Sequence, residues 1–112
     1  MTPREILDKA YKALDDKLAT DITVLDVAPL TIIADYFIIC TANSASHANA
    51  LVGELGKVMK EQNVMPHHIE GYNSPNWVLL DYPGVIIHIF DNKTREFYAL
   101  ERVWADAAPV TV

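Results

Sequence analysis

A nearly uncharged stretch covers residues 71–90, in which Asp81 is the only formally charged side chain. Within it, two runs of β-branched and aromatic residues, Trp77–Tyr82 and Val85–Phe90, stand on either side of Pro83-Gly84. Such runs around a Pro-Gly pair predict two antiparallel strands joined by a turn. A half-exposed hairpin normally alternates apolar and polar side chains, and this one does not. We therefore expect both faces of the hairpin to be protected from water, either by the chain itself or by a partner.

The register of this hairpin follows if Pro83-Gly84 forms the turn, because Tyr82 then pairs with Val85. A slip of one residue would exchange the two faces, and L-Pro-Gly favours a type II turn, which fits tight hairpins poorly. In the expected register, the face suited to lie under helices carries Val78, Leu80, Tyr82, Val85, Ile87 and Ile89. The second face carries Trp77, Leu79, Asp81, Ile86, His88 and Phe90.

The second face groups large apolar residues around one carboxylate and one imidazole. Such a patch usually marks a partner-binding surface, and its composition matches that of binding hot spots. The alternative is that helices cover both faces of the sheet, which makes Trp77 and Phe90 ordinary core residues. If the face binds a partner, we expect central contacts from Trp77 and Leu79 and a charge-assisted contact from Asp81 to Lys or Arg. Supporting contacts would come from Tyr82, Ile86 and His88.

The rest of the chain predicts helices around a sheet. Thr2 and Glu5 form a capping box at the start of one helix, and Ser44 can cap a second. The order of elements is helix, two strands, helix, three strands, helix, and each helix has one apolar stripe to bury. We expect an α/β fold of the α+β type, a single mixed sheet of about five strands with helices packed on it. One domain would span residues 1–108, and residues 109–112 would form a frayed tail.

The elements outside the hairpin and the first helix have approximate expected bounds. Strands are expected at residues 22–27, 32–41 and 66–70, and helices after Ser44 and at residues 95–107. The stripe that the last helix would bury consists of Phe97, Leu100, Trp104 and Ala107. Its solvated face would carry Arg95, Glu96, Glu101 and Arg102.

Composition narrows the class of partner. The 112 residues include 9 basic and 15 acidic side chains, for a net charge of −6, which opposes binding to a polyphosphate backbone. The longest uncharged stretch, residues 36–53, is too polar to span a membrane. The first residues lack the pattern of a signal peptide, and the single Cys40 cannot form an internal disulfide. We expect a cytoplasmic protein with no direct, sequence-specific binding to nucleic acid and no association with a membrane.

Residues suited to catalysis or metal binding are sparse. Cys40 and His47 could act as a nucleophile and its base, but a thiol inside an apolar strand is usually inert packing. His67, His68 and Glu70 could suggest a metal, yet adjacent strand residues point to opposite faces and further ligands are missing. We interpret them as surface residues. The sequence thus predicts no catalytic residue, no metal and no cofactor.

Two alternatives to a partner-binding function remain open. One is a nucleotidyl or phosphoryl transferase, for which Asp35, Asp81 and Ser44 would be the anchors of a degenerate metal site. The other is self-association into a homodimer, because an exposed sheet face can pair with its own copy.

Several segments in order, spread over nearly the whole chain, point to one family: Asp35–Thr41, the capped helix after it, Glu70-Gly71, Trp77–Tyr82, Val85–Phe90 and Arg95–Trp104. Together they resemble the ribosomal silencing factors, also called the Iojap family. The resemblance implies a small α/β domain like a degenerate nucleotidyltransferase. It also implies binding to protein fourteen of the large ribosomal subunit, which blocks joining of the small subunit and lowers translation during starvation. Two positions depart from the family pattern: Pro83-Gly84 replaces Gly and an acidic residue, and Ser46 replaces a common basic residue.

Overall fold

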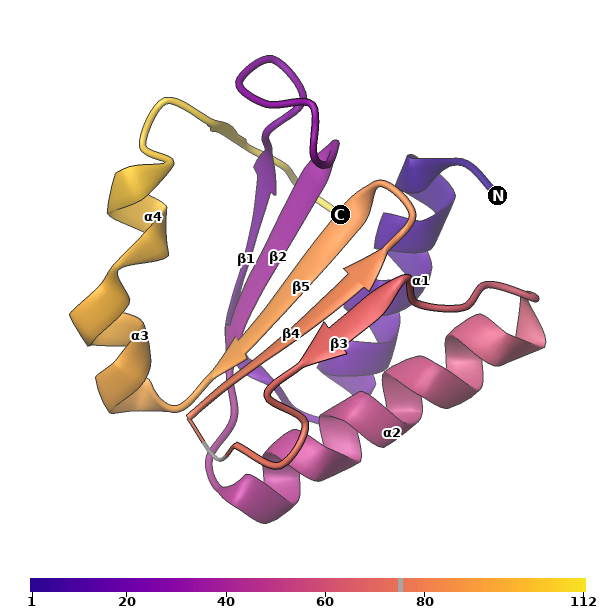
Figure 1. Ribbon diagram of the computed structural model, residues 1–112, viewed down its shortest axis with the longest axis vertical. Helices are drawn as coiled ribbons and strands as arrows, with labels where there is room; N and C mark the ends of the chain where they lie inside the picture. The colour runs from indigo at the N-terminus through magenta and orange to yellow at the C-terminus, as the bar shows by residue number, and fades with distance from the viewer. Residues whose placement is uncertain (75) are drawn as a thin grey trace.

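The computed structural model describes residues 1–74 and 76–112. One mixed sheet has the strand order β3-β4-β5-β2-β1-β6, in which β2 and β5 are parallel and all other neighbours are antiparallel (Figure 1). The expected α+β fold with helices on a single sheet is confirmed, with 6 strands instead of about five. The elements are α1 (Pro3–Asp16), β1 (Thr20–Asp26), β2 (Tyr36–Thr41), α2 (Ala45–Glu61), β3 (His68–Glu70), β4 (Trp77–Tyr82), β5 (Val85–Phe90), α3 (Asn92–Tyr98), α4 (Leu100–Val103) and β6 (Ala108–Pro109).

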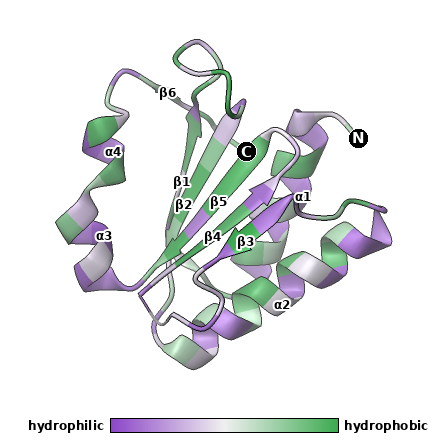
Figure 2. Cartoon of the chain, in the orientation of Figure 1, coloured by the Kyte–Doolittle hydropathy of each residue, from purple (hydrophilic) through white to green (hydrophobic). Residues whose placement is uncertain are grey.

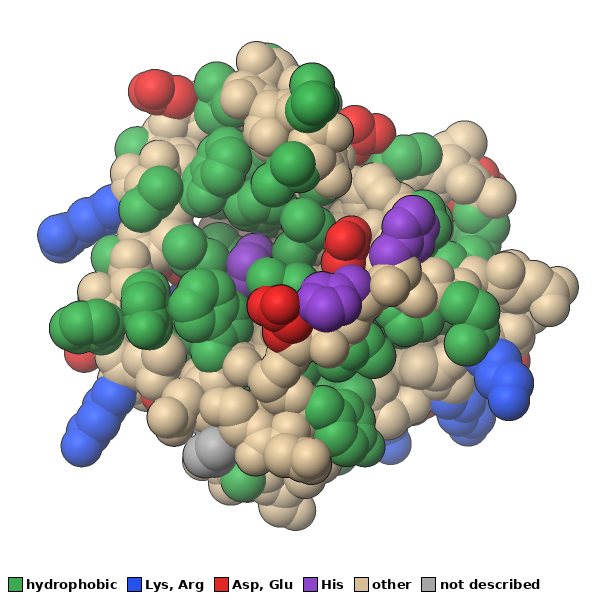
Figure 3. Space-filling model, in the orientation of Figure 1, with side chains coloured by type: hydrophobic (Ala, Val, Ile, Leu, Met, Phe, Trp, Pro, Cys, Tyr) green, Lys and Arg blue, Asp and Glu red, His purple; other side chains and the backbone are tan. Residues whose placement is uncertain are grey.

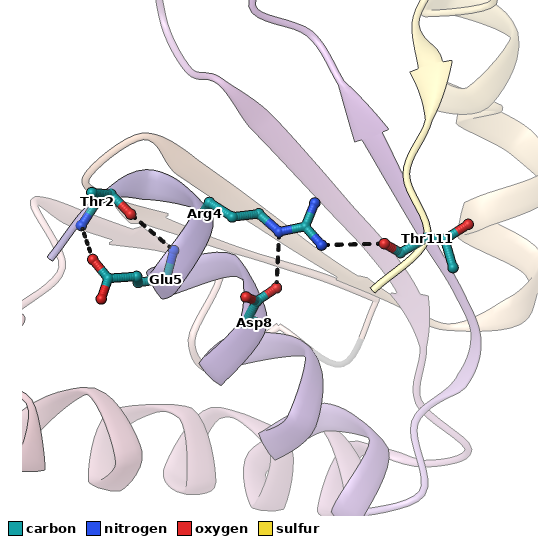
Figure 4. Close-up of polar contacts among 5 residues, drawn as sticks. All are labelled: Thr2, Arg4, Glu5, Asp8 and Thr111. Atoms are coloured by element: carbon teal, nitrogen blue, oxygen red, sulfur yellow. Dashed lines mark hydrogen bonds and ion pairs between the residues drawn. The ribbon is translucent and has the colours of Figure 1, made fainter.

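The two long helices begin where their caps predict. The Thr2 hydroxyl accepts a hydrogen bond from the Glu5 N–H at 3.2 Å, and the Glu5 carboxylate accepts one from the Thr2 N–H at 2.9 Å (Figure 4). At α2, the Ser44 hydroxyl accepts from the His47 N–H at 3.0 Å. Each cap satisfies backbone donors that the first helical turn leaves free. Both predicted N-termini are confirmed.

The β4–β5 hairpin has the predicted register, with Tyr82 opposite Val85 and Trp77 opposite Phe90. Gly84 has φ +78°, the left-handed value that the second central residue of a type II turn needs. The carbonyl of Gly84 accepts hydrogen bonds from the N–H groups of Asp35 and Tyr36, at 2.9 and 3.0 Å. These bonds join the hairpin tip to the start of β2.

The first face of the sheet is buried under α1 and α2. Its β5 residues Val85, Ile87 and Ile89 are at most 1% exposed and pack with Ile6, Leu7 and Leu14 of α1. Figure 2 shows that the central strands β2 and β5 are mostly hydrophobic, whereas the two helices carry mixed stripes. This layer forms the larger of the two apolar clusters.

The last helical segment differs from the single helix predicted at residues 95–107. Asp91 caps α3, its carboxylate accepting from the Thr94 N–H at 2.7 Å, so the helix begins earlier. Ala99 has φ 49°, in the left-handed region, and separates α3 from α4. The break means that residues before and after Ala99 do not share one stripe. Phe97 is therefore 80% exposed rather than buried, while Leu100 and Trp104 pack on the sheet as expected.

We call residues 92–104 the α3–α4 arm. Its Arg95, expected on the solvated face, instead has a side chain only 13% exposed. The guanidinium donates to the hydroxyls of Thr41 and Thr23 at 2.9 and 3.1 Å, and to the Glu101 carboxylate at 2.9 Å. These contacts fix the arm across the ends of β1 and β2, on the side of the sheet opposite α1 and α2 (Figure 1).

The C-terminal tail, expected to be frayed over residues 109–112, makes hydrogen bonds to the rest of the chain. Ala108 and Pro109 pair antiparallel with β1, and the Val110 N–H donates to the Val24 carbonyl at 2.9 Å. Arg4 of α1 donates to the Thr111 carbonyl at 3.2 Å (Figure 4). The free backbone groups of an edge strand attract such pairing, which the tail's own sequence does not reveal. Over the described ranges, no helix has the length and hydrophobicity to cross a membrane.

Candidate interaction surface

The register of strands β1 to β5 defines the second face of the sheet. The α3–α4 arm covers its β1, β2 and β5 part, where Phe37 is 3% and Phe90 is 1% exposed. The β3 and β4 part stays open, since Leu79 and Asp81 are half-buried and β3 is exposed along its length. The arm thus covers one part of this face and leaves the other part open, and partner binding at the open part stays a prediction. The second face comprises Thr23, Leu25, Phe37, Ile39, Thr41, Ile86, His88, Phe90, Trp77, Leu79, Asp81, His68 and Glu70.

Trp77 lies at the boundary between the covered and open parts. Its indole is half-buried, with ring centroids 4.8 Å from both Phe90 of β5 and Tyr98 of α3. The indole Nε1–H donates to Nδ1 of His88 at 3.2 Å. Trp77 thus joins the hairpin to the arm while part of its surface remains accessible.

Charged groups border the open part. Glu70 pairs with Leu79 across β3 and β4, and His68 pairs with Asp81, so Leu79 lies beside two carboxylates. Nε2 of His68 lies 2.9 Å from the Glu70 carboxylate, and both side chains are more than half exposed. A surface with an apolar centre and carboxylates at its edge fits a partner that carries basic side chains.

An open groove of about 720 Å³ lies between the β3–β4 connection and α3, and we call it the Trp77 groove. Figure 3 shows hydrophobic side chains gathered around a hollow on this face of the molecule, with acidic and histidine side chains beside it. Lys93 lies on the α3 side and Glu70 on the opposite side. The residues that line the Trp77 groove include Glu70, Gly71, Trp77, Leu79, Phe97 and Tyr98.

The predicted contact residues divide into accessible and buried groups. Trp77 and Leu79 line the groove, and Asp81 is half-buried on the open part of the face. Tyr82 is 1% exposed and points to the opposite side, under α1 and α2, so it cannot contact a partner in the groove. Ile86 and His88 are 8% and 5% exposed, on the β5 part of the face that the arm covers. Tyr82, Ile86 and His88 therefore offer little accessible surface for direct contacts, and the predicted contacts with accessible surface are Trp77, Leu79 and Asp81.

Sequence reasoning missed Tyr98 and Glu70 as residues of this surface. Asp91 is the signal that could have placed Tyr98. An Asp three residues before Thr94 is a good N-cap, and a helix that begins after Asp91 instead of at residue 95 ends at Tyr98. Glu70 could be placed only by the β3–β4 register, which the sequence does not specify because β3 has three residues and is exposed on both faces.

The residues considered for catalysis lie apart from this surface. Cys40 is fully buried, and burial raises the pKa of its thiol to about 12, which keeps it from acting as a thiolate at neutral pH. His47 has both ring nitrogens occupied: Nδ1 accepts from the Asn43 N–H at 2.9 Å, and Nε2 lies 2.8 Å from the Lys17 carbonyl. Ser44 caps α2. Among residues 1–74 and 76–112, no three His, Cys, Asp or Glu side chains are grouped to hold a metal ion.

The fold and this face define a small α+β domain whose sheet is covered by long helices on one side and half open on the other. The family model described as "Ribosomal silencing factor during starvation" matches residues 1–112. The chain belongs to the ribosomal silencing factor family, as its sequence resemblance indicated. The family description implies regulation of translation at the ribosome and names no enzymatic activity.

Relatives and solved structures agree with this membership. The chain is 39% identical to the ribosomal silencing factor of Halalkalibacterium halodurans over 98% of this chain and 94% of that protein. A mouse relative, named for mitochondrial assembly of the ribosomal large subunit, is 34% identical over 88% of this chain and 44% of its own length. A crystal structure of a Chromobacterium violaceum protein is 32% identical, with a TM-score of 0.90 over 94% of this chain and 88% of that chain. A Bacillus halodurans structure is 35% identical, with a TM-score of 0.86 over 97% and 99% of the two chains.

Proposed function

We propose that this protein represses translation in the cytoplasm by binding the large ribosomal subunit through its protein fourteen and blocking joining of the small subunit. The observation that carries the proposal is the open, acidic-edged apolar surface around Trp77 in a chain of the ribosomal silencing factor family. Obstruction of this kind requires no catalysis, because a bound body excludes the second subunit for as long as it stays bound. Affinity and residence time then set the degree of repression.

The charge of the chain supports a basic ribosomal partner. The net charge is −6, and Glu70 and Asp81 lie on the open part of the second face. Opposite charges speed the encounter of two proteins, and burial of apolar groups at the centre of the contact slows their separation. Trp77 and Leu79 supply that apolar centre, with Asp81 available to pair with a Lys or Arg.

Association of purified ribosomal subunits tests the proposed activity. Small and large subunits are mixed with and without the protein and separated on a sucrose gradient. We expect the protein to move with the large subunit and to reduce the peak of associated ribosomes. Unchanged association at saturating protein refutes the proposal. If isolated protein fourteen does not bind in a pull-down although the large subunit does, the proposed point of attachment is wrong.

A Trp77→Ala substitution tests the surface. If Trp77 is a binding hot spot, its truncation should cost at least about 2 kcal/mol, or roughly 30-fold in affinity for large subunits. Trp104→Ala is the matched control, since Trp104 packs against the same apolar cluster without lining the groove. Equal losses in the two variants, both folded by circular dichroism, would assign the effect to packing and reject the surface.

The acidic edge has its own control. Asp81→Asn should slow association with large subunits and reduce its dependence on salt, because the attraction at long range is weakened. Glu61→Gln removes the same charge from the exposed end of α2, on the other side of the sheet, and should leave both properties unchanged. An equal effect of the two changes would show that only net charge matters.

The same open face allows two copies to pair across a twofold axis, which would compete with the ribosome. Light scattering over a range of concentrations measures this pairing in the free protein. A mass that remains at 12.5 kDa at every concentration excludes it.

A further inference from the structure

His88 lies beneath the Trp77 groove and does not reach its surface. The residue is 5% exposed and pairs with Leu79 across the hairpin. Its ring stacks on Phe90 at a centroid distance of 6.1 Å and meets Phe37 nearly edge-on at 5.2 Å. A partner that binds at the groove therefore meets Trp77 before it could meet His88. Any effect of His88 on binding must pass through a neighbouring residue.

The hydrogen bond from Trp77 fixes the protonation state of His88. An indole N–H can only donate, so Nδ1 of His88 must carry a lone pair and accept. The ring proton is then on Nε2, which is buried and has no hydrogen-bond partner within the part of the chain that the structure describes. Burial lowers the pKa of His88 to about 4, which keeps the ring neutral at pH 7. The imidazole is thus held as an acceptor directed at Trp77.

A role in packing alone does not account for an imidazole at this position. A phenyl ring would fill similar space without leaving a buried N–H unpaired, which destabilises a folded protein. What an imidazole provides here, and a phenyl ring does not, is a hydrogen-bond acceptor at Nδ1. That acceptor satisfies the indole N–H of Trp77, the residue at the boundary of the open surface.

The bond also selects one orientation of the indole. The contacts of Trp77 with Phe90 and Tyr98 involve the ring faces, with interplanar angles of 32° and 49°. Ring contacts of this kind constrain the plane of the indole, and a half-turn about χ2, whose minima are broad and roughly two-fold in aromatic side chains, returns the ring to the same plane. Such a half-turn would carry the N–H away from Nδ1 and move the six-membered ring to the other side. The hydrogen bond to His88 therefore favours the observed edge of the indole.

We propose that His88 is a positioning residue for ribosome binding: by accepting the indole N–H, it fixes which edge of Trp77 the groove presents to the partner. The inference rests on the proposed function, because it assigns the oriented indole to the binding surface. His88 itself makes no contact with the partner. Removing the acceptor should therefore disorder the indole and weaken binding, even where the space is filled.

Two variants separate the acceptor from the ring. His88→Phe keeps an aromatic ring and removes the acceptor, whereas His88→Asn places an amide oxygen close to the position of Nδ1. We expect His88→Phe to broaden or double the indole N–H resonance of Trp77, to speed its exchange with solvent, and to weaken binding to large subunits by about tenfold. His88→Asn should restore a single protected resonance and most of the affinity. Trp77→Phe identifies the resonance among those of the two tryptophans.

The wild-type protein supplies a measurement that does not depend on the folding of a variant. Nitrogen-15 shifts of the His88 ring distinguish its tautomers, and we expect a proton on Nε2 and none on Nδ1. A proton on Nδ1 overturns the proposal, as does a His88→Phe variant with an unchanged Trp77 resonance and unchanged affinity. If the wild-type protein does not bind large subunits, the proposed function fails, while the resonance of Trp77 in the two variants still decides whether His88 orients the indole.

Discussion

Lowering the pH from 7 to 4 should destabilise the folded protein, and His88 should contribute a measurable share of that loss. In an unfolded chain the imidazole pKa is about 6.5, whereas burial lowers the pKa of His88 in the folded protein to about 4. Between these values the unfolded chain binds a proton that the folded protein does not. The free energy of unfolding therefore falls as the pH decreases through this window, and the contribution of His88 is fully present above pH 6.5.

The gap between the two pKa values sets the magnitude. At about 1.4 kcal/mol per pH unit, the interval from 6.5 to about 4 corresponds to roughly 3.5 kcal/mol in full, of which about 3 kcal/mol is lost by pH 4, where the folded protein is itself half protonated at His88. The free energy of unfolding of a typical domain is roughly 5 to 15 kcal/mol, so a loss of this size is a large fraction of it. The aromatic rings of Phe37, Trp77 and Phe90 surround His88, so the surroundings offer little compensation for a charge.

Urea unfolding followed by circular dichroism, at pH values from 7 to 4, measures this effect in the wild type and in His88→Asn. Hydrogen bonds lower the pKa of Glu5 and of Asp91, and these carboxylates lose stabilising contacts at low pH in both proteins. The difference between the two proteins isolates His88. We expect the wild type to lose about 3 kcal/mol more than the variant by pH 4. Parallel pH curves for the two proteins would refute the reasoning, because they would show that His88 is protonated in the folded state.

Three further changes test other parts of the structure. Gly71→Ala should lower the midpoint of thermal unfolding by several degrees, because Gly71 has φ +74° and an added Cβ would collide with the Trp77 carbonyl oxygen; an unchanged midpoint would contradict this. Arg95→Met removes the hydrogen bonds to the Thr41 and Thr23 hydroxyls and to the Glu101 carboxylate. It should reduce the free energy of unfolding, measured in urea, by about 2 kcal/mol. A loss of less than roughly 0.5 kcal/mol would show that other contacts hold the arm. Cys40 should react with a thiol reagent only at the rate of unfolding, since its thiol is buried and its pKa is raised to about 12; fast labelling of the native protein would disprove it.

The hairpin register was predictable from the position of Pro83-Gly84. With the turn placed there, Tyr82 pairs with Val85, and each further side chain is assigned to a face because successive strand residues point to opposite sides of a sheet. The assignment of Tyr82 as a contact residue contradicted that same register, which had placed it under the helices. The caps of α1 and α2 were equally readable, since a cap depends on residues three positions apart.

After β5, the Asp91 cap is a local signal for the start of α3, but the break at Ala99 and the position of Arg95 are not predictable from local patterns. The break at Ala99 places a residue without special turn chemistry in the left-handed region, where packing of Leu100 and Trp104 on the sheet must compensate for its strain. The sequence around Arg95 is typical of an exposed helix face. The side chain is buried against the sheet because it donates to the hydroxyls of Thr41 and Thr23, two contacts that are distant in sequence. The arm in turn decides how much of the second face stays open, so the limits of the candidate surface depended on these long-range contacts.

The two edge strands of the sheet, β3 and β6, are protected from pairing with another chain in different ways. At one edge the C-terminal residues Ala108 and Pro109 pair with β1, and a proline there cannot donate to an incoming strand. At the other edge β3 has only three residues, two of which, His68 and Glu70, carry polar heads. Edge strands that are short, charged or contain proline disfavour the addition of further strands and hence the formation of fibrils. In a chain with 51% hydrophobic residues, both edges of the sheet are thus poor templates for the addition of a further strand.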